Sequence, residues 1–200
     1  MIKVENVDVW GFEHAIRGMR NPKNSWSRID STFDTLNIGP NDLELMKRLY
    51  KAGTEHRKYL RQIFVSMDIT APLYWWKEFD TYKVGTVSNS CSTMHKIAAK
   101  EFVTDDFSHE HLTDFSIECL QSTIDVLNNY REKYIETKDK DLWWQLIQLL
   151  PSSYNQKRTI TMNYENVMAI INQRSSHKLD EWHILIDELY KLPYVKELRA

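Results

Sequence analysis

The sequence has few of the residues that define several common protein classes. Its 200 residues include only two cysteines, Cys91 and Cys119, with no Cys-x-x-Cys pair and no Cys/His cluster at zinc spacing. This pattern indicates neither a disulfide framework nor a structural zinc site. Glycine and proline occur five times each, while 42% of the residues are hydrophobic. Such a composition is typical of an ordered globular chain, and we expect a single domain over residues 1–200.

Neither sign of charge dominates. Lysine and arginine number 26 against 28 acidic residues, for a net charge of -2. The chain therefore lacks the basic footprint that nucleic acid or an anionic membrane would require, and we expect neither as a partner. No uncharged run approaches the roughly 18 apolar residues that span a bilayer, and the first ten residues do not resemble a secretory signal. We expect a cytoplasmic protein.

Several catalytic motifs are also missing. The sequence contains no GxxxxGK[ST], GxGxxG or GxSxG, which removes the usual phosphate-loop and serine-hydrolase signatures. His109 and His111 cannot share a metal ion if they lie on a helix, because residues two apart point in nearly opposite directions. His183 has no second histidine at helical spacing, so we expect no metal site.

Hydrophobic periodicity predicts many helices and a few scattered strands, which is the pattern of an α+β fold. Residues 11–31 are predicted to begin with a helical turn and continue as an irregular loop, and residues 84–93 to form a loop. Strands are predicted at 2–10, 64–72 and 154–163, and helices at 41–53, 72–83, from about 94, at 106–136, 138–151, 164–173 and 180–190.

A few polar residues are candidates for chemistry. Arg17, Arg20, Ser25 and Arg28 lie in the long loop and could contact an anion, because long loops in compact domains are often functional. Cys91 precedes a predicted helix, whose N-terminus can lower the pKa of a thiol and make it nucleophilic. The alternative is that Cys91 is a small buried thiol.

Arg174 ends an apolar helical run, where a guanidinium needs a carboxylate or phosphate partner. Around it, Leu150-Pro151 leads to a strand closing in Thr161-Met162-Asn163, and Arg174 is followed by His177 and Glu181-Trp182. This order resembles the C-terminal half of the flavin-dependent thymidylate synthases. Upstream, Thr54-Glu55-His56 resembles a segment that lies near the flavin in that family.

The family signature RHRxxSxNExSxRY falls on residues 81–94. Lys83, Thr86 and Cys91 are chemically close to the family's residues. The other signature positions are changed: Thr81 and Thr93 stand for arginines, Tyr82 for His, Ser88 for Asn and Asn89 for Glu. Ile147 stands for a further nucleotide-binding arginine.

The resemblance implies a small antiparallel or mixed sheet flanked by long helices, in a homotetramer. It also implies an enzyme in which FAD, NADPH and methylenetetrahydrofolate serve to methylate dUMP or a related pyrimidine nucleotide. The candidate catalytic residues are Cys91 and Lys83. The implied cofactor-binding residues are Asn163, His177, Tyr82 and Ser88. The implied substrate-binding residues are Arg174, Lys83, Asn89, Cys91 and Thr93.

Two alternatives follow from the changed signature. The chain could be a catalytically altered or inactive homologue that keeps the oligomeric scaffold and a nucleotide or anion pocket. In a purely structural interpretation, Arg174 pairs with Asp180 or Glu181 and the remaining residues pack a core.

Overall fold

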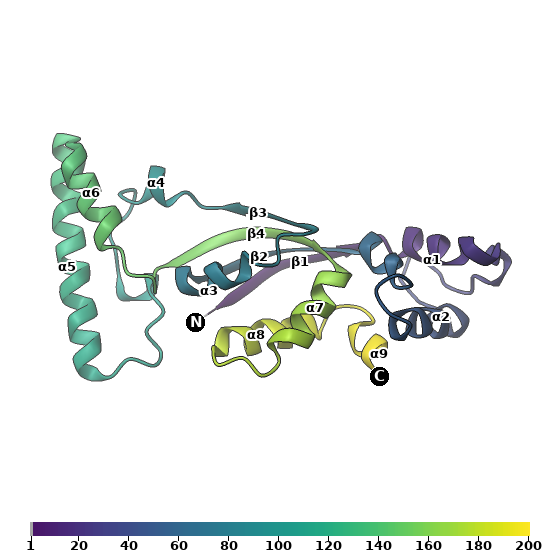
Figure 1. Ribbon diagram of the computed structural model, residues 1–200. Coiled ribbons are helices and arrows are strands. Elements are labelled where there is room, and N and C mark those ends of the chain that lie inside the picture. Colours follow the sequence, from purple (N-terminus) through teal and green to yellow (C-terminus); the bar gives the residue numbers. More distant parts are fainter. Residues whose placement is uncertain (1) are drawn as a thin grey trace. The chain divides into compact units, whose positions relative to one another are not determined.

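The computed structural model describes residues 2–200 and shows an α+β fold, as the sequence predicts (Figure 1). Four strands form one antiparallel sheet in the order β1-β2-β4-β3. The strands are β1 (Lys3–Trp10), β2 (Phe64–Pro72), β3 (Thr86–Ser90) and β4 (Asn155–Asn163). The helices are α1 (Phe12–Arg20), α2 (Pro40–Lys51), α3 (Leu73–Phe79), α4 (Thr93–Lys96), α5 (Asp114–Thr137), α6 (Lys140–Leu149), α7 (Tyr164–Arg174), α8 (Asp180–Leu189) and α9 (Val195–Arg199).

The chain divides into two compact units, which are described separately. The first unit comprises Met1–Lys3, Ile69–Thr81 and Asn89–Arg158, and the second comprises Val4–Asp68, Tyr82–Ser88 and Thr159–Ala200. The single domain predicted for residues 1–200 stays a prediction.

The sheet has one apolar face because burial alternates along β2 and along the second half of β4. Every second side chain of β2 from Val65 to Ala71 is buried, and on β4 the buried Ile160 and Met162 stand on either side of the partly exposed Thr161. The buried set is Val65, Met67, Ile69 and Ala71 on β2 and Ile160 and Met162 on β4, each at most 1% exposed. The strands predicted at 64–72 and 154–163 are thus confirmed as β2 and β4.

The edge strand β1 carries an irregularity in its middle. Asn6 has a left-handed backbone conformation with φ of 52°. Its side-chain Nδ2 donates a hydrogen bond of 2.9 Å to Oδ2 of Asp68 on β2. Thr159 of β4 donates to the other oxygen of the same carboxylate at 2.6 Å. Asp68 therefore links three neighbouring strands on the polar face of the sheet.

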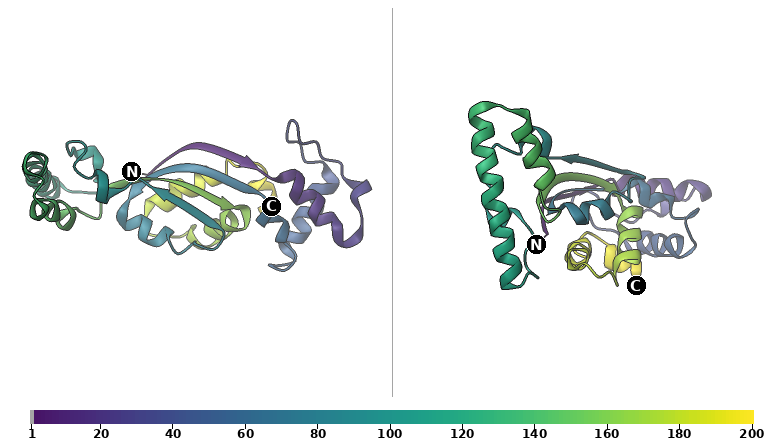
Figure 2. Two further views of the ribbon diagram at one scale, coloured as in Figure 1. Left: turned by 90° about the horizontal axis from the view of Figure 1, so that it is seen from above. Right: turned by 60° about the vertical axis from the view of Figure 1, so that its left-hand side comes forward.

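In the first unit, α5 and α6 lie side by side (Figures 1 and 2). Lys138 ends α5 in the left-handed conformation, and the Asp139 side chain begins α6 by accepting a hydrogen bond from the Asp141 backbone N–H. The helices enclose an apolar cluster of Ile97, Phe102, Phe107, Leu120, Ile124, Leu127 and Leu146. Burial of this cluster holds the helix pair together.

Four predicted elements differ from the structure. The predicted loop at 84–93 contains strand β3, which shows no apolar alternation because nearly all of its side chains are exposed. The helix predicted from residue 106 begins at Asp114, because Phe107 is buried in a bridge to Tyr154 rather than on a helix. The helix near residue 94 has only four residues, and the turn predicted after residue 11 is a nine-residue helix. Within residues 2–200, no helix is both long enough and apolar enough to cross a membrane.

The contrast between the two faces of α5 can be tested with one substitution at two positions. Ile124→Ala is expected to lower the free energy of unfolding by about 2–5 kcal/mol. The Ile124 side chain is 2% exposed, so its truncation leaves a cavity in the packed cluster. Ile135→Ala is the matched control, since Ile135 is 41% exposed, and it should cost less than about 1 kcal/mol. Urea unfolding monitored by circular dichroism measures both. Equal losses would contradict the packing described for α5.

Candidate functional site

Arg174 lies at the end of α7 in the second unit and meets two aromatic rings. Its guanidinium carbon is 4.7 Å from the ring centre of Trp182 and 5.5 Å from that of Tyr82. Its Nε donates a hydrogen bond of 2.9 Å to the Tyr82 hydroxyl, which donates in turn to Gln173 at 3.0 Å. We call Tyr82, Arg174, His177 and Trp182 the arginine corner. The corner holds a planar cation against planar aromatic surfaces, which orients the guanidinium.

His177 joins this corner through the turn that follows α7. Its ring packs edge-on against Trp182 at 6.1 Å, and its backbone N–H donates to the Arg174 carbonyl at 3.1 Å. The N–H of Leu179 donates to His177 Nδ1 at 3.1 Å, so Nδ1 is the acceptor nitrogen of the ring. His183 donates from Nε2 to the His177 carbonyl at 2.8 Å. These bonds fix both the ring and its tautomer.

Asn163 connects the end of β4 to the start of α7. Its Oδ1 accepts a hydrogen bond of 3.1 Å from the Asn166 N–H, which makes it the N-cap of α7. Asn166 donates from Nδ2 to the Val84 carbonyl at 2.7 Å and to the Thr86 hydroxyl at 2.8 Å. The sequence did not lead us to predict a role for Asn166, although it stands three residues after Asn163.

The turn held by Asn166 requires glycine at residue 85. Gly85 has a φ of 73°, and a Cβ there would lie 2.5 Å from Asn163 Nδ2. Any other residue would combine backbone strain with a clash. The first part of the signature stretch is thus fixed against the N-terminus of α7.

The remaining predicted site residues do not all gather at the arginine corner. Lys83 and Ser88 belong to the second unit and are exposed. Asn89, Cys91 and Thr93 belong to the first unit, where Cys91 and Thr93 line a cavity of about 440 Å³. Cys91 is exposed, so the alternative of a buried thiol is wrong. No cluster of three or more metal-binding side chains occurs among the residues that the structure describes.

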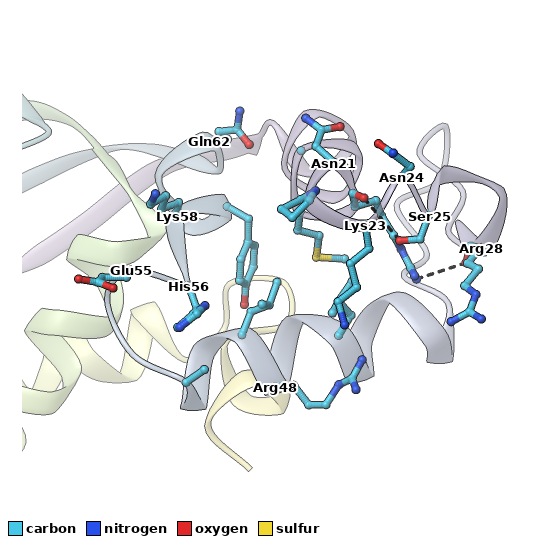
Figure 3. Close-up of a pocket in the computed structure, with 18 of the residues that line it drawn as sticks. Asn21, Lys23, Asn24, Ser25, Arg28, Arg48, Glu55, His56, Lys58 and Gln62 are labelled. Carbon is cyan, nitrogen blue, oxygen red and sulfur yellow. Dashed lines mark hydrogen bonds between the residues drawn. The ribbon is translucent and has the colours of Figure 1, made fainter.

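A larger cavity of about 1100 Å³ opens in the second unit between α1, the loop that follows it, α2 and the segment from residue 55 to 62. Figure 3 shows Lys23, Arg28 and Arg48 toward one end of it and Glu55, His56 and Lys58 toward the other. The lining is strongly cationic. Of the predicted anion contacts, Arg20, Ser25 and Arg28 line this cavity; Arg17 is not among its lining residues. Lys23, Arg48 and Lys58 were missed, because they come from three separate segments.

Arg20 is already committed to an internal partner. Its Nε and Nη2 donate to Oδ1 of Asp42 at 2.9 and 2.6 Å, and both residues are buried. The other oxygen of Asp42 accepts bonds from the Asp30 N–H, the Ser31 N–H and the Ser31 hydroxyl. This fully bonded pair fastens the loop to the start of α2, so Arg20 shapes the cavity and its charge is neutralised.

The Arg20–Asp42 pair predicts a large stability effect. Arg20→Ala is expected to lower the free energy of unfolding by about 3–5 kcal/mol, because it leaves the Asp42 carboxylate buried without its cation. Arg17→Ala is the control in the same helix, where the side chain is exposed, and it should change stability by about 0.5 kcal/mol or less. Denaturant unfolding of the two variants measures the difference. A comparable small loss for Arg20→Ala would mean that the pair is not a fastening point.

Glu165 lies in the first turn of α7, beside Asn163, and pairs with two arginines. Its carboxylate accepts bonds from Arg57 at 3.3 Å and from Arg61 at 2.5 Å. Burial alone would raise the pKa of the Glu165 carboxyl. The hydrogen bonds and charges of Arg61 and Arg57 outweigh it and hold the pKa below the ordinary value of 4.5.

The lowered pKa of Glu165 predicts a pH-dependent stability. The unfolded chain takes up this proton at a higher pH than the folded chain, so the stabilisation is present above about pH 4.5 and is lost as the pH falls through the folded pKa. Between pH 6 and about pH 3, Glu165→Gln should therefore lose less stability than the unmodified protein. Urea midpoints across this range measure the effect, with Glu136→Gln on the exposed surface of α5 as control. Parallel curves for Glu165→Gln and the unmodified protein would count against the ion pair.

No family model and no curated protein sequence matches the chain. Solved structures do. A flavin-dependent thymidylate synthase, ThyX, from Helicobacter pylori, solved with FAD and dUMP, is 19% identical over 94% of this chain and 92% of its own, with a TM-score of 0.69. A second structure of that enzyme with the same two ligands covers both chains completely at 17% identity and a TM-score of 0.71.

The chain has the fold of the flavin-dependent thymidylate synthases. The fold is shared by a UMP/dUMP methylase, PolB from Streptomyces cacaoi, solved with 5-Br dUMP. It is 15% identical over 96% of this chain and 89% of its own, with a TM-score of 0.65. The fold that the order of motifs around Arg174 implied is therefore confirmed over nearly the whole chain. At these identities the similarity establishes the fold alone, and any chemistry has to be argued from the residues of this chain.

Proposed function

We propose that this protein is a flavin-dependent methyltransferase of the thymidylate synthase type, which methylates dUMP or a related pyrimidine nucleotide. The observation that carries the proposal is a fold shared from end to end with enzymes solved with FAD and dUMP. The arginine corner, which holds Arg174 against two aromatic rings, supports it as the proposed nucleotide contact. We propose NADPH and methylenetetrahydrofolate as the cosubstrates. We propose a homotetramer as the assembly of the protein.

The chemistry of the second unit fits a flavin dinucleotide. The diphosphate of FAD is an anion, and the cavity of about 1100 Å³ is lined by Lys23, Arg28, Arg48 and Lys58 against one carboxylate, Glu55. The cavity is as large as the largest common cofactor sites, which run to about 1000 Å³. Bound FAD would supply hydride transfer from NADPH and the reduction that completes the methyl group. Asn163, His177, Tyr82 and Ser88 are the further residues that we propose to contact it.

In this proposal the residues of the protein bind and orient the nucleotide. Arg174 is proposed to bind the nucleotide with the N–H groups of its guanidinium fork, which the rings of Tyr82 and Trp182 keep in one plane. Lys83, Asn89, Cys91 and Thr93 are the other proposed nucleotide contacts, with Cys91 and Lys83 as candidate catalytic groups. The Leu179 N–H donates to His177 Nδ1 and so fixes the orientation of the ring, which is one of the proposed flavin contacts.

The second candidate is a homologue that has lost this activity and keeps a nucleotide or anion pocket. It is favoured by the replacement of signature arginines by Thr81 and Thr93, and by Ile147 in place of another. Phosphate recognition by bidentate arginines would then be weakened. Both candidates predict binding of a nucleotide or another anion, and only the first predicts turnover.

Protein produced with ample riboflavin is expected to copurify with FAD, seen as a flavin absorbance spectrum. Adding dUMP at about 100 times its Kd should stabilise the protein by about 2.7 kcal/mol, measured as a thermal shift.

Arg174→Lys keeps the positive charge but loses the guanidinium fork, so it should weaken dUMP binding by roughly 10- to 100-fold. Arg17→Lys on the exposed face of α1 is the control and should leave dUMP binding unchanged.

Tritium release from labelled dUMP in the presence of NADPH and methylenetetrahydrofolate separates the two candidates. Release would establish the enzyme, and its absence with FAD and dUMP both bound would favour the inactive homologue. A colourless protein that dUMP does not stabilise would contradict the proposed function. If Arg174→Lys lowers stability with dUMP affinity intact, Arg174 has only a structural role.

A further inference from the structure

Beside the arginine corner lies a residue that the sequence did not single out, Gln173. Its Oε1 accepts a hydrogen bond of 3.0 Å from the Tyr82 hydroxyl, and the same hydroxyl accepts one of 2.9 Å from Arg174 Nε. Gln173 and Arg174 are neighbours in the last turn of α7, where successive side chains project about 100° apart. Both nevertheless reach one phenol oxygen. We call Gln173, Tyr82 and Arg174 the tyrosine link.

The chemistry of the three groups fixes the direction of the bonds in the tyrosine link. Arg174 Nε can only donate, so the Tyr82 oxygen must accept from it. The single proton of the phenol then goes to Gln173, whose Oε1 can only accept. Hydrogen bonds in such a series polarise one another, so the bond to Gln173 makes the Tyr82 oxygen a stronger acceptor for Arg174.

The tyrosine link and the Trp182 ring restrain the guanidinium in different directions. The fully buried Trp182 ring lies 4.7 Å from the guanidinium carbon, and the Tyr82 ring lies 5.5 Å from it. The two rings are inclined at 65° to each other, so the flat guanidinium can lie parallel to at most one of them. Trp182 is the nearer face. The Nε–H bond lies in the plane of the guanidinium, so its bond to Tyr82 sets the direction within that plane.

The backbone that carries Tyr82 is held against the same helix. Just after it in the sequence, the Val84 carbonyl and the Thr86 hydroxyl accept hydrogen bonds of 2.7 and 2.8 Å from Asn166 in the first turn of α7. The Tyr82 hydroxyl is bonded at the last turn, to Arg174 and its neighbour. The stretch from Tyr82 to Thr86 is therefore attached to both ends of one helix, and the phenol has a defined position relative to Arg174.

The bond from Arg174 to Tyr82 is made through Nε. The fork that arginine offers to a phosphate or carboxylate uses pairs of N–H groups in one plane. A bond at Nε, where the side chain joins the guanidinium, therefore controls the direction in which the two terminal nitrogens face.

We propose that Tyr82 and Gln173 are positioning residues, which set the plane of the Arg174 guanidinium and so determine how tightly this protein binds a nucleotide. The orientation of Arg174 follows from the bonds of the tyrosine link. Its effect on a nucleotide rests on the proposed function, in which Arg174 is a nucleotide contact. A side chain that is oriented in advance loses less entropy when a ligand binds, so the link raises affinity through Arg174.

Isothermal titration calorimetry with dUMP measures the effect on affinity. Tyr82→Phe keeps the ring and removes the hydroxyl, and it is expected to weaken dUMP binding roughly three- to tenfold. Gln173→Ala removes only the far acceptor and is expected to weaken it roughly two- to threefold. Tyr190→Phe is the matched control. It removes a hydroxyl at the end of α8 and keeps the ring that lies against Arg199, so it should leave dUMP binding unchanged.

Combined substitutions show whether these residues act through their neighbours. Tyr82→Phe should have little further effect in Arg174→Lys, which has no planar guanidinium to orient. Gln173→Ala should have little further effect in Tyr82→Phe, because the hydroxyl through which it acts is gone. Full additivity in either pair would overturn the proposal, since each side chain would then act on dUMP independently.

A second measurement does not depend on dUMP. Exchange of the Arg174 Nε proton with solvent can be followed by heteronuclear NMR, with the signal assigned by its loss in Arg174→Lys. This exchange should be roughly tenfold faster in Tyr82→Phe and also faster in Gln173→Ala, because the proton loses its acceptor or keeps a weaker one. Gln173 is exposed, so Gln173→Ala keeps the test open if thermal unfolding shows that Tyr82→Phe is not folded.

The two measurements separate this proposal from the proposed function. Unchanged exchange in the folded variants would overturn the tyrosine link, whatever dUMP does. If exchange responds and dUMP binds all variants equally, the effect on affinity is overturned while the proposed function stands. If exchange responds and the unmodified protein binds no dUMP, the orientation of Arg174 by Tyr82 and Gln173 is supported and the proposed function fails.

Discussion

The cap that Asn163 places on α7 is the interaction on which the proposed site depends. It ends β4, begins α7 and leaves no room for a side chain at Gly85, so a strand, a helix and a turn meet at one amide. Asn166 continues this link by bonding to the backbone and side chain of the same turn. The direction of α7 is fixed at this point, and Arg174 at its far end is aimed accordingly. Loss of the cap would therefore disturb both ends of the helix.

Much of the fold could be predicted because burial leaves a period in the sequence. Strands β2 and β4 alternate apolar and polar residues, and the order of Pro151, Asn163 and Arg174 pointed to a known arrangement that the structure confirms. Strand β3 could not be predicted, since exposed Thr, Ser and Asn residues carry no such period. The predicted start of α5 was wrong because Phe107 lies outside any helix. This apolar residue forms a β-bridge with Tyr154 instead.

The two cavities could not be predicted for a different reason. Each is assembled from segments that lie far apart in the sequence, such as Lys23 with Lys58, or Lys3 with Lys157. The spacing of residues along the sequence does not show that these segments come together in the fold. Arg20 illustrates the converse limit: its residue type suggested an anion contact, but only the structure shows that Asp42 already neutralises it.

The left-handed Asn6 has a consequence for how the molecule behaves among its own copies. Strand β1 is at the edge of the sheet, where unpaired N–H and C=O groups can recruit a strand from another chain. A residue with positive φ in the middle of that strand breaks the regular row of these groups, and its tether to Asp68 keeps the break in place. An incoming strand would find no continuous ladder to extend. One asparagine thus serves as a built-in guard against edge-to-edge aggregation.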